Sequence, residues 1–395
     1  MKLLLYSHFF APSIGGVETS VLSLTRGLAE LRTSKGEPEF DLAVVTATPA
    51  GDSDDCALPF RVIRQPNLLR LWHLIRKSDV IHIAGPALAP LFLAKLARKP
   101  VVVEHHGYQA ICSNGMLMHQ PDLSICPGHF QAGRYAECLR CNAKETSWPR
   151  SCANLLLMFP RHALARRVAS NLAVSQHVLL RLALPRSSII YYGIGDPLSN
   201  THASQPLSSI TGRICFAYVG RLVQEKGIPI LLQAAQKLIS EGRQFEVRII
   251  GDGAERPNLE AMIRGQHLES YVHISGFLTG AALTNAVRDV RVVVMPSICE
   301  ETAGLAAIEQ MMRGRLVIVS EIGGLGEVVG DAGLKFSPGS ADALVDRMRE
   351  VLQSPALIDF FGLKARERAL RLFLQGRMIE EHARVYRGML RERNG

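Results

Sequence analysis

A chain of 395 residues is long enough for two or three domains, and a composition of 47% hydrophobic and 21% charged residues is typical of a globular protein with an extensive core. The net charge is +9, but residues 1–200 carry 21 Lys and Arg against 14 Asp and Glu, whereas residues 201–395 carry 24 against 22. No apolar run reaches the ~20 residues of a membrane span, and no nucleic-acid recognition motif accompanies the basic residues. We therefore expect neither a membrane-spanning protein nor a nucleic-acid-binding protein.

The chain begins with a short apolar run, Lys2 to Tyr6, which lacks a small-residue cleavage site and leads directly into a Gly-Gly turn. We interpret this run as a first β-strand and not as a signal peptide. We accordingly expect cytoplasmic localisation, and eight cysteines that are thiols or metal ligands and not disulfides.

Short β-branched runs alternate with helical patterns along both halves of the chain, which predicts an α/β protein with parallel sheets. Five strands are predicted in each half. They are 3–7, 42–46, 80–83, 101–105 and 171–174, then 214–219, 246–250, 272–274, 292–295 and 316–319. The pattern predicts two doubly wound, Rossmann-like domains that face a cleft.

The segment Pro12-Ser13-Ile14-Gly15-Gly16-Val17-Glu18 follows the first strand and opens a helix that is predicted to end near Leu31. Paired glycines let the backbone approach a ligand, and the helix amino terminus attracts an anion. A tight strand-to-helix turn without a ligand is the alternative. The segment lacks the spaced glycines of the dinucleotide fingerprint, so a nicotinamide enzyme is disfavoured.

Four cysteines, Cys112, Cys126, Cys138 and Cys141, follow His105 and His106, and His119 and His129 lie among them. One Cys-x-x-Cys pair with two single cysteines predicts a structural zinc site that staples an irregular insert, residues 107–152, over the acceptor side of the cleft. Reduced buried thiols are the alternative. A catalytic metal is not expected here.

Residues 193–212 are rich in Gly, Pro, Ser, Thr and Asn, with little periodicity, and predict a linker. We place an N-terminal domain at 1–195, the linker at 196–212 and a C-terminal domain at 213–376. A basic amphipathic helix at 377–395 is expected to cross back onto the first domain.

The second domain carries three glycine turns at predicted strand ends. The first, Gly220 to Gly227, includes Arg221 and Lys226, two fixed positive charges suited to a diphosphate leaving group. Its spacing differs from that of a P-loop, so NTP hydrolysis is not expected. The turns Gly251-Asp252-Gly253 and Gly323-Gly324 complete a candidate nucleotide cradle; solvated surface charge is the alternative for the two cations.

The stretch Pro296-Ser297 to Glu309 follows a predicted buried strand at the sheet edge where ligands bind in doubly wound folds. Glu301 is predicted in the loop and Glu309 about two turns into the next helix, which begins near Gly304. A sugar and a ribose supply the hydroxyls that two half-buried carboxylates need. A capping Glu and a solvated Glu are the alternative.

Taken in order, Pro-x-x-Gly-Gly-x-Glu, Gly-Arg-Leu…Glu-Lys-Gly, Gly-Asp-Gly, Pro-Ser…Glu-x7-Glu and Gly-Gly-x-x-Glu resemble the group 1 retaining glycosyltransferases of the GT-B fold, known as glycosyltransferase family 4. The resemblance spans residues 12–338. It implies that the C-terminal domain binds the nucleotide sugar and the N-terminal domain binds the acceptor. Ala303 stands where the family usually has Phe, and Gln310 where it usually has Ala, so the sugar is not specified.

The resemblance also implies a role for each motif residue. Arg221 and Lys226 would bind the diphosphate, Glu301 the sugar ring and Glu309 the ribose. His106 would contact the transferred sugar, with His105 as the alternative because the motif is short. Backbone amides would come from the glycine turns and the start of the helix, namely Gly15, Gly16, Gly251, Gly253, Ala303, Gly304 and Leu305.

The expected reaction is retaining transfer of a hexose from a UDP- or GDP-sugar to a saccharide or lipid-linked acceptor, in the synthesis of a cell-envelope polysaccharide, glycolipid or related glycan. No metal or other cofactor is expected for catalysis, because Arg and Lys neutralise the diphosphate. The alternatives are a non-catalytic sugar- or nucleotide-binding scaffold and a nucleotide-sugar isomerase on the same fold.

A basic segment from Arg161 to Arg167, together with Arg70, Arg76 and Lys77, predicts peripheral contact with anionic lipid at the inner face of the membrane. A solvated helix face is the alternative.

Overall fold

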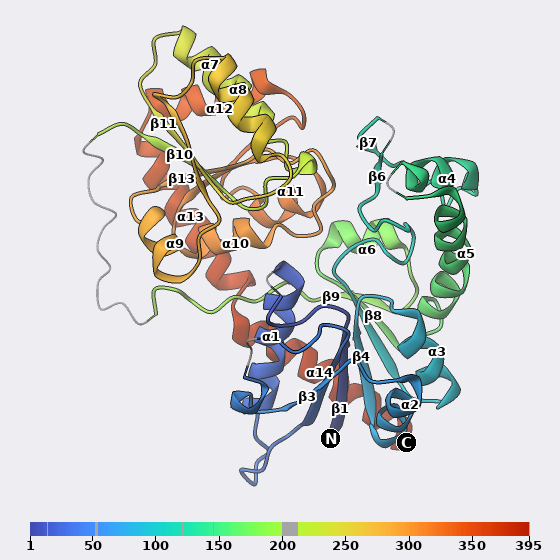
Figure 1. The fold of residues 1–395 in the computed structure, drawn as a ribbon. Helices are drawn as coiled ribbons and strands as arrows, with labels where there is room; N and C mark the ends of the chain where they lie inside the picture. Colours follow the sequence, from blue (N-terminus) through green and yellow to red (C-terminus); the bar gives the residue numbers. More distant parts are fainter. Residues whose placement is uncertain (14, 52–53, 121, 145, 200–211, 395) are drawn as a thin grey trace. The chain divides into compact units, whose positions relative to one another are not determined.

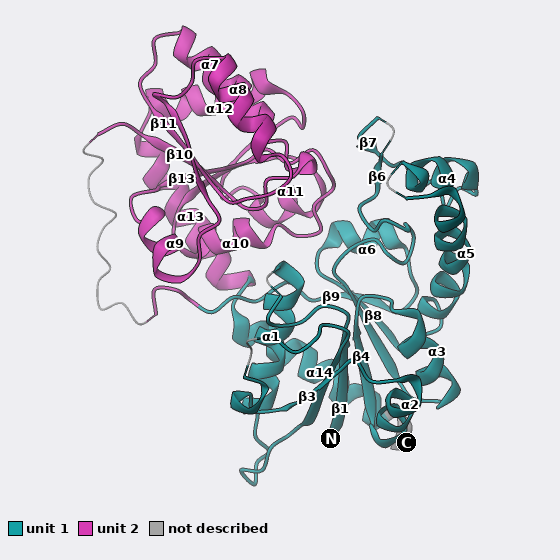
Figure 2. Cartoon of the chain, viewed as in Figure 1, with its two compact units in different colours: residues 1–195, 373–395 teal, residues 196–372 magenta. Residues whose placement is uncertain are grey.

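The computed structural model describes residues 1–13, 15–51, 54–120, 122–144, 146–199 and 212–394. The chain forms two compact units (Figure 2): Met1–Gly195 with Phe373–Gly395, and Asp196–Leu372. The first unit is therefore built from both ends of the chain. Most of the linker predicted at 196–212, namely residues 200–211, lies outside the described residues.

A parallel sheet forms the centre of the first unit (Figure 1). Among the described residues it has seven strands in the order β3-β2-β1-β4-β5-β8-β9. Strands β2 and β3 lie on one side of β1, and the later strands begin with β4 on its other side. The strand order therefore reverses between β1 and β4, which flank a topological switch point. The strands are β1 (Lys2–Ser7), β2 (Asp41–Thr46), β3 (Arg61–Arg64), β4 (Val80–Ala84), β5 (Val101–His105), β8 (Ser170–Ala173) and β9 (Ser187–Ile189).

Alternate residues of each strand point to opposite faces of the sheet. Because most strand residues are apolar, both faces are apolar. Leu3, Leu5 and Val102 lie in the core beneath α1 (Gly16–Glu30) and α14 (Gln375–Asn394). Residues of the other parity form a second core beneath the helices of the opposite face. Those helices are α2 (Leu68–Lys77), α3 (Leu88–Leu96) and the end of α5 (Trp148–Ala165).

The carboxyl-terminal helix α14 is an integral part of the first unit. Met378, Ile379 and Ala383 are buried in the same core as α1, and Arg387 forms an ion pair with Glu39 at 2.6 Å. This unit begins its second segment at Phe373, four residues before the predicted boundary at 377.

The insert after β5 folds onto the first unit. It contains a short antiparallel hairpin, β6 (Met118–His119) and β7 (Ser124–Ile125), followed by α4 (Tyr135–Ala143) and α5. Residues 121 and 145 of this insert lie outside the described part of the chain. The remaining helix of the first unit, α6 (Gln176–Leu182), connects β8 to β9.

The second unit has its own parallel sheet. Within the described residues it has six strands in the order β12-β11-β10-β13-β14-β15, so that β10 and β13 flank its switch point. The strands are β10 (Cys215–Val219), β11 (Glu246–Ile250), β12 (Val272–Gly276), β13 (Val292–Met295), β14 (Leu316–Ser320) and β15 (Leu334–Phe336). The helices are α7 (Ile228–Ser240), α8 (Arg256–Gly265), α9 (Gly280–Ala286), α10 (Leu305–Met312), α11 (Gly323–Val329), α12 (Ala341–Gln353) and α13 (Ala356–Leu372).

The predicted fold class is confirmed, and all ten predicted strands are present to within two residues. Three strands of the two parallel sheets, β3, β9 and β15, were not predicted, and neither was the short β6–β7 hairpin. Each of these three strands has three or four residues, some of them charged or polar, because it lies at the edge of its sheet. No helix in the described part of the chain is both long enough and apolar enough to cross a bilayer.

Gly193 gives a test of how tightly α14 packs. A Cβ atom on Gly193 would lie 2.6 Å from the Met378 Cβ and 2.8 Å from the Gln375 Cα, at the start of this helix. We expect Gly193→Ala to destabilise the first unit by about 1–3 kcal/mol, as overpacking of a core does. The measurement is the midpoint of thermal unfolding.

The matched control is Gly388→Ala in the same helix, where an added Cβ meets no atom within 4 Å. That change is expected to be neutral, or stabilising by up to about 1 kcal/mol, because Ala favours a helix more than Gly does. Equal midpoints for the two variants would contradict the close packing of α14.

Candidate active site

The candidate site of the second unit lies at the carboxyl ends of β10, β11, β13 and β14. In open parallel sheets this edge binds ligands, above all at the switch point. The loop after β10 carries Arg221 and Lys226, and the loop after β13 carries Glu301. The fold therefore brings to one edge residues that are up to 80 positions apart in the sequence.

Lys226 and Glu301 form the central contact of this edge. The Lys226 Nζ lies 2.5 Å from the Glu301 Oε1, which also accepts a hydrogen bond from the Ser297 hydroxyl at 2.6 Å. The side chains of Lys226 and Glu301 are only 20% and 12% exposed. Ser297 was not predicted as a site residue; its position four residues before Glu301 was the available signal.

The charges of this pair support each other. Burial raises the pKa of the Glu301 carboxyl, but the Lys226 ammonium and the two hydrogen bonds outweigh burial and lower the pKa overall. Burial lowers the pKa of Lys226, and the Glu301 carboxylate reverses this effect, so that the pKa is raised. Both groups are therefore charged at neutral pH, with the ammonium held in place at the sheet edge.

Arg221 differs from Lys226 in its surroundings. Its side chain is 73% exposed, and its nearest carboxylate, on Glu225, lies 3.9 Å away. The backbone of the loop is nevertheless fixed, because the Tyr218 hydroxyl donates a hydrogen bond to the Arg221 carbonyl at 2.7 Å. The exposed guanidinium is accessible to an anion from solvent.

The start of α10 presents unsatisfied backbone donors. Gly304 lies at the N-cap position with φ +67°, and no side chain caps the helix. The first amides of a helix have no acceptor within the helix, so those of Leu305 and Ala306 are available to a ligand, whereas the Ala307 amide donates to the Gly304 carbonyl at 2.8 Å. Ala303 is buried immediately before this turn.

Glu309 lies in the second turn of α10 and is half-buried. Among the described residues, no hydrogen bond or ion pair satisfies its carboxylate, and burial raises its pKa. Glu301 and Glu309 therefore occupy different environments, as predicted from their spacing: Glu301 is paired with a lysine, whereas Glu309 is available to donors from a ligand.

Gly251 and Gly253 have a structural role that their position in a candidate cradle did not predict. A Cβ on Gly251 would lie 1.8 Å from the carbonyl oxygen of Gly220, and one on Gly253 would lie 2.3 Å from that of Leu222. The Leu222 amide also donates to the Asp252 carbonyl at 2.9 Å. These glycines thus let the loop after β11 pack against the loop that carries Arg221.

Gly323 supports the Glu301 loop in the same way. Its φ is +58°, and a Cβ there would lie 2.5 Å from the backbone oxygen of Glu301. The amide of Gly324 donates a hydrogen bond to that oxygen at 2.6 Å. The third glycine turn of the second domain therefore holds the backbone of Glu301 in position.

His105 and His106 lie on opposite faces of the first unit's sheet. His105 is fully buried, and its Nε2 lies 2.9 Å from the Asn171 Oδ1. Burial lowers the pKa of His105 to about 4, so this imidazole is neutral. The Asn171 amide in turn donates to the carbonyls of Ala165 and Pro185. His105 is thus part of a structural network.

His106 lies just beyond the end of β5. Its ring stacks on Tyr192, whose hydroxyl is 2.9 Å from the Nδ1, and its Nε2 is 3.5 Å from the Glu104 Oε2. Burial lowers the pKa of His106 despite the Glu104 carboxylate. Tyr192 and Glu104 were not predicted as site residues; Glu104 lies in the predicted strand 101–105, two residues before His106.

The Gly15-Gly16 turn opens α1 at the carboxyl end of β1. Gly15 is extended, with φ −174°, and no side chain caps the helix. The Glu18 carboxylate folds back over the turn, because its Oε2 is 2.4 Å from the position of a Cβ on Gly15. An anion at this helix terminus would therefore have to displace the Glu18 side chain.

The four cysteines of the insert line one small cavity of about 20 Å³, together with His119 and His129. Cys138 and Cys141 lie one turn apart on α4, and burial and the neighbouring sulfurs raise the pKa of the Cys138 thiol to about 12. The Cys141 sulfur accepts the Gln120 amide at 3.4 Å. The cavity gathers the residues of a Cys₄ site, and the zinc there stays a prediction.

A pair of glycine substitutions tests the support of Glu301. We expect Gly323→Ala to weaken binding of a nucleoside diphosphate or its sugar by about tenfold or more, because the added Cβ displaces the Glu301 backbone. Isothermal titration measures the effect. Gly326→Ala in the same helix is the control, since its Cβ would make only contacts of 3.5 Å or longer. Equal affinities in the two variants would contradict this account.

Comparisons with known proteins agree with this geometry. Residues 213–354 match the family "Glycosyl transferases group 1". The chain is 27% identical over 394 residues to 2-deoxystreptamine N-acetyl-D-glucosaminyltransferase of Streptomyces fradiae, covering 91% of this chain and 90% of that protein. It is 33% identical over 141 residues to 2-deoxystreptamine glucosyltransferase of Streptomyces kanamyceticus, covering 35% of this chain and only about a third (36%) of that relative's length.

The fold is also found among solved structures. Anabaena HepE, determined in complex with UDP and glucose, superposes with a TM-score of 0.71 at 18% identity, covering 98% of this chain and 100% of HepE. The shared architecture, the match over the second unit and the motif residues at its sheet edge agree with one another. Residues 213–354 match the group 1 glycosyltransferases, and the chain as a whole has the GT-B fold.

Proposed function

We propose that the protein transfers a hexose from a nucleoside-diphosphate sugar, UDP- or GDP-linked, to a saccharide or lipid-linked acceptor, with retention of the anomeric configuration. The observation that carries the proposal is the buried Lys226–Glu301 pair at the switch point of the second sheet. The pair places a fixed ammonium where the fold binds ligands. The relatives named as glycosyltransferases support the same reaction class.

The second unit would bind the donor. Lys226 and the exposed Arg221 would neutralise the charge that grows on the diphosphate as the bond to the sugar breaks. The free amides at the start of α10 would donate to phosphate or sugar oxygens. The available carboxylate of Glu309 would accept hydrogen bonds from the ribose hydroxyls, and the second oxygen of Glu301 would accept one from the sugar ring.

Retention of the anomeric configuration would follow if the leaving phosphate accepts the proton of the acceptor hydroxyl. The leaving phosphate would accept the proton of the acceptor hydroxyl, which attacks on the face that the phosphate leaves. No side-chain nucleophile is then needed, and Lys226 and Arg221 would replace a metal at the diphosphate. In the first unit, His106 would stabilise positive charge at the anomeric carbon. His105 is a poor candidate because Asn171 and burial fix it inside the sheet.

Substitution of Lys226 tests the proposal. We expect Lys226→Ala to lower the transfer rate by about 10²–10³-fold, since a positioned charge is lost from the transition state. The assay measures release of nucleoside diphosphate from UDP- and GDP-sugars with and without an acceptor. Lys237→Ala, which removes a lysine paired with Asp342 on the surface of the same unit, is the control and should keep wild-type turnover.

The same assay separates the other functions. An isomerase would produce a new nucleotide sugar without acceptor, and a scaffold would release nothing. Near-wild-type turnover in Lys226→Ala would overturn the role of the ammonium. Because that variant leaves Glu301 buried without its partner, thermal unfolding of the variant must show that the second unit is still folded.

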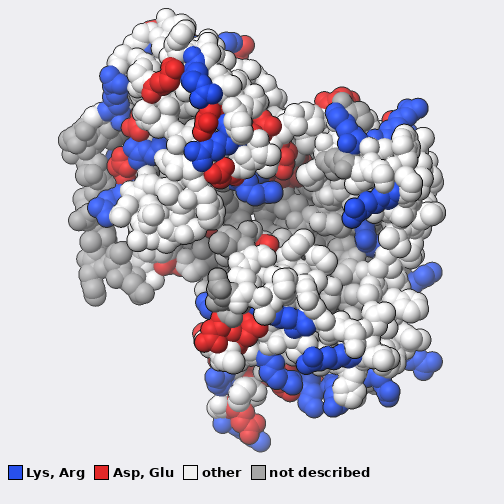
Figure 3. All heavy atoms as spheres, in the orientation of Figure 1, with Lys and Arg blue, Asp and Glu red and all other residues white. Residues whose placement is uncertain are grey.

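We further propose that the first unit contacts anionic membrane through α2, α3 and α5. Helix α3 packs against both α2 and α5. In Figure 3, Lys and Arg side chains gather over the lower part of this unit, around α2 and α3. The basic residues on these helices and within two positions after them are Arg70, Arg76, Lys77, Lys95, Arg98, Arg150, Arg161, Arg166 and Arg167.

Sequence analysis identified the basic residues of α2 and of the end of α5 but not Lys95, Arg98 or Arg150, and it did not single out the exposed apolar side chains of these helices. The exposed large apolar side chains on these helices are Leu68, Leu69, Phe92, Leu96, Trp148, Leu156, Leu157 and Phe159. Apolar side chains that enter the interface and cations that attract anionic headgroups together bind peripheral proteins to membranes. Such a surface would suit a lipid-linked acceptor at the inner face of the membrane.

Sedimentation with vesicles tests this surface. We expect the protein to bind vesicles that contain anionic lipid and to bind neutral vesicles weakly. The double variant Phe92→Ser/Leu156→Ser should bind anionic vesicles less, because it removes two of the exposed apolar side chains. Leu363→Ser, at an exposed leucine of α13 in the second unit, is the control. Equal binding to anionic and neutral vesicles would overturn the proposal.

A structural zinc in the cysteine cavity of the insert is also part of this proposal. Four sulfurs, the donors of a common structural zinc site, line this cavity, but they are not gathered within 4.8 Å of one another in the described structure, so binding would have to draw them together. The ion would hold the β6–β7 hairpin against α4, and it would take no part in the transfer reaction.

A further inference from the structure

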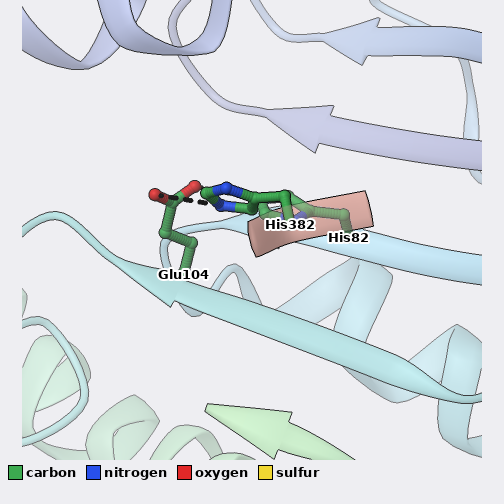
Figure 4. A group of neighbouring side chains, drawn as sticks. All are labelled: His82, Glu104 and His382. Atoms are coloured by element: carbon green, nitrogen blue, oxygen red, sulfur yellow. Dashed lines mark ion pairs between the residues drawn. The ribbon is translucent and has the colours of Figure 1, made fainter. Parts of the chain in front are cut away.

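A second group of candidate metal ligands lies inside the first unit, away from the cysteines. His82 comes from β4, Glu104 from β5 and His382 from α14, and all three are buried (Figure 4). His82 is paired in register with Val102, two residues before Glu104, so their side chains share the face of the sheet that α14 covers. One ligand atom from each lies within 4.8 Å of the others.

Each of the two imidazoles directs its Nε2 atom at the Glu104 carboxylate. The His82 Nε2 is 3.2 Å from the Glu104 Oε2, and the His382 Nε2 is 3.5 Å from the Glu104 Oε1. Neither Nε2 makes a hydrogen bond of normal geometry within the described structure. The two ring nitrogens therefore converge on the carboxylate without being satisfied by it.

The Nδ1 atom of each histidine has a hydrogen-bond partner. The His382 Nδ1 lies 2.8 Å from the Met378 carbonyl, so it must carry the proton of a neutral ring. The His382 Nε2 then points a lone pair at a carboxylate, which is repulsive unless a proton or a metal ion lies between them. The His82 Nδ1 is fixed by the Tyr386 hydroxyl at 2.8 Å. Metal-binding histidines are typically oriented by such a contact at the second nitrogen.

The distances suit a small divalent cation. Ligand bonds of about 2.0–2.1 Å in a tetrahedral site place neighbouring ligand atoms about 3.3 Å apart. The two nitrogen-to-oxygen distances here are 3.2 and 3.5 Å. Two imidazoles and one carboxylate favour Zn²⁺ over Mg²⁺ or Ca²⁺, which prefer oxygen ligands. In the described structure, no Lys or Arg forms an ion pair with Glu104 to balance its charge.

We propose that His82, Glu104 and His382 bind one divalent cation of the zinc class, which fastens α14 to the sheet of the first unit. The ligands come from segments 278 residues or more apart on either side of the second unit, since His82 and Glu104 precede it and His382 follows it. The ion would also fix the carboxylate that lies 3.5 Å from the His106 Nε2. The role is structural, and no step of sugar transfer passes through the ion.

The experiment must separate this site from the cysteine cavity. Full-length protein carrying Cys138→Ser and Cys141→Ser provides the background in which only the proposed site remains. After dialysis with Zn²⁺ and removal of free metal, we expect about one zinc per chain by elemental analysis. The additional change His382→Gln or Glu104→Gln should reduce zinc to the blank, whereas His273→Gln, at an exposed histidine of β12, should not change it.

Thermal unfolding gives a second measurement. Added Zn²⁺ should raise the unfolding midpoint of the background protein in a concentration-dependent way, and this shift should vanish in His382→Gln. Zinc that is unaffected by both His382→Gln and Glu104→Gln would overturn the site. A background protein that binds no zinc would show that a proton, and not a metal, bridges His382 and Glu104.

If the His382 and Glu104 variants fail to fold, the cation site can still be tested on the background protein itself. Co²⁺ replaces Zn²⁺ in tetrahedral sites, and its visible bands report the ligands. Co²⁺ added to the folded background protein should show tetrahedral bands without a thiolate charge-transfer band. Absence of the tetrahedral bands would overturn the proposal without any further substitution.

Discussion

Parallel strand pairing is the constraint on which the rest of this structure depends. Every crossover returns the chain to the same end of the sheet, so the carboxyl ends of all strands meet at one edge. In the second unit the crossovers bring Lys226, after β10, next to Glu301, after β13. The apolar faces of the sheet supply the stability, and the loops at the carboxyl edge remain available for chemistry.

The Lys226–Glu301 pair would be a poor choice for stability alone. Removing two charges from water costs free energy that their attraction does not reliably return. The loops around the pair are nevertheless tightly built, because Gly227 and Gly323 allow backbone contacts that any Cβ would block. A rigid frame around a buried ammonium is the arrangement expected where a charge must be positioned before reaction. The proposed transferase function would explain why the chain buries this ion pair despite the free energy of desolvation.

The first unit concentrates its buried polar groups beneath α14. His82, Glu104, His382 and Tyr386 are all fully or almost fully buried at the junction of β4, β5 and this helix. An apolar core would hold the helix without the cost of burying these groups. Their mutual orientation, with each histidine anchored at Nδ1 and directed at Glu104 through Nε2, is the observation behind the proposed cation. The same carboxylate contacts His106, so stability of the helix and geometry of that histidine are coupled.

Local patterns were sufficient to predict the fold class, ten strands of the two parallel sheets, and the positions of Glu301 in a loop and Glu309 in a helix. Strand periodicity, glycine turns and the strand-to-helix switch are encoded within windows of about ten residues, which is why they are readable. The edge strands β3, β9 and β15 were missed because strands of three or four residues with one solvated side carry little periodicity.

Contacts between distant segments were decided only by the tertiary structure. The pairing of Lys226 with Glu301, the packing of Gly251 on Gly220 and the convergence of His82 and His382 on Glu104 join residues that no local pattern relates. The pleat of β5 likewise points Glu104 and His105 to opposite faces, and His106, just beyond the strand, lies near Glu104 and not near the partner of His105. Strand periodicity was enough to predict which edge of each sheet carries the candidate residues, whereas only the packing of distant segments shows which of their side chains meet there.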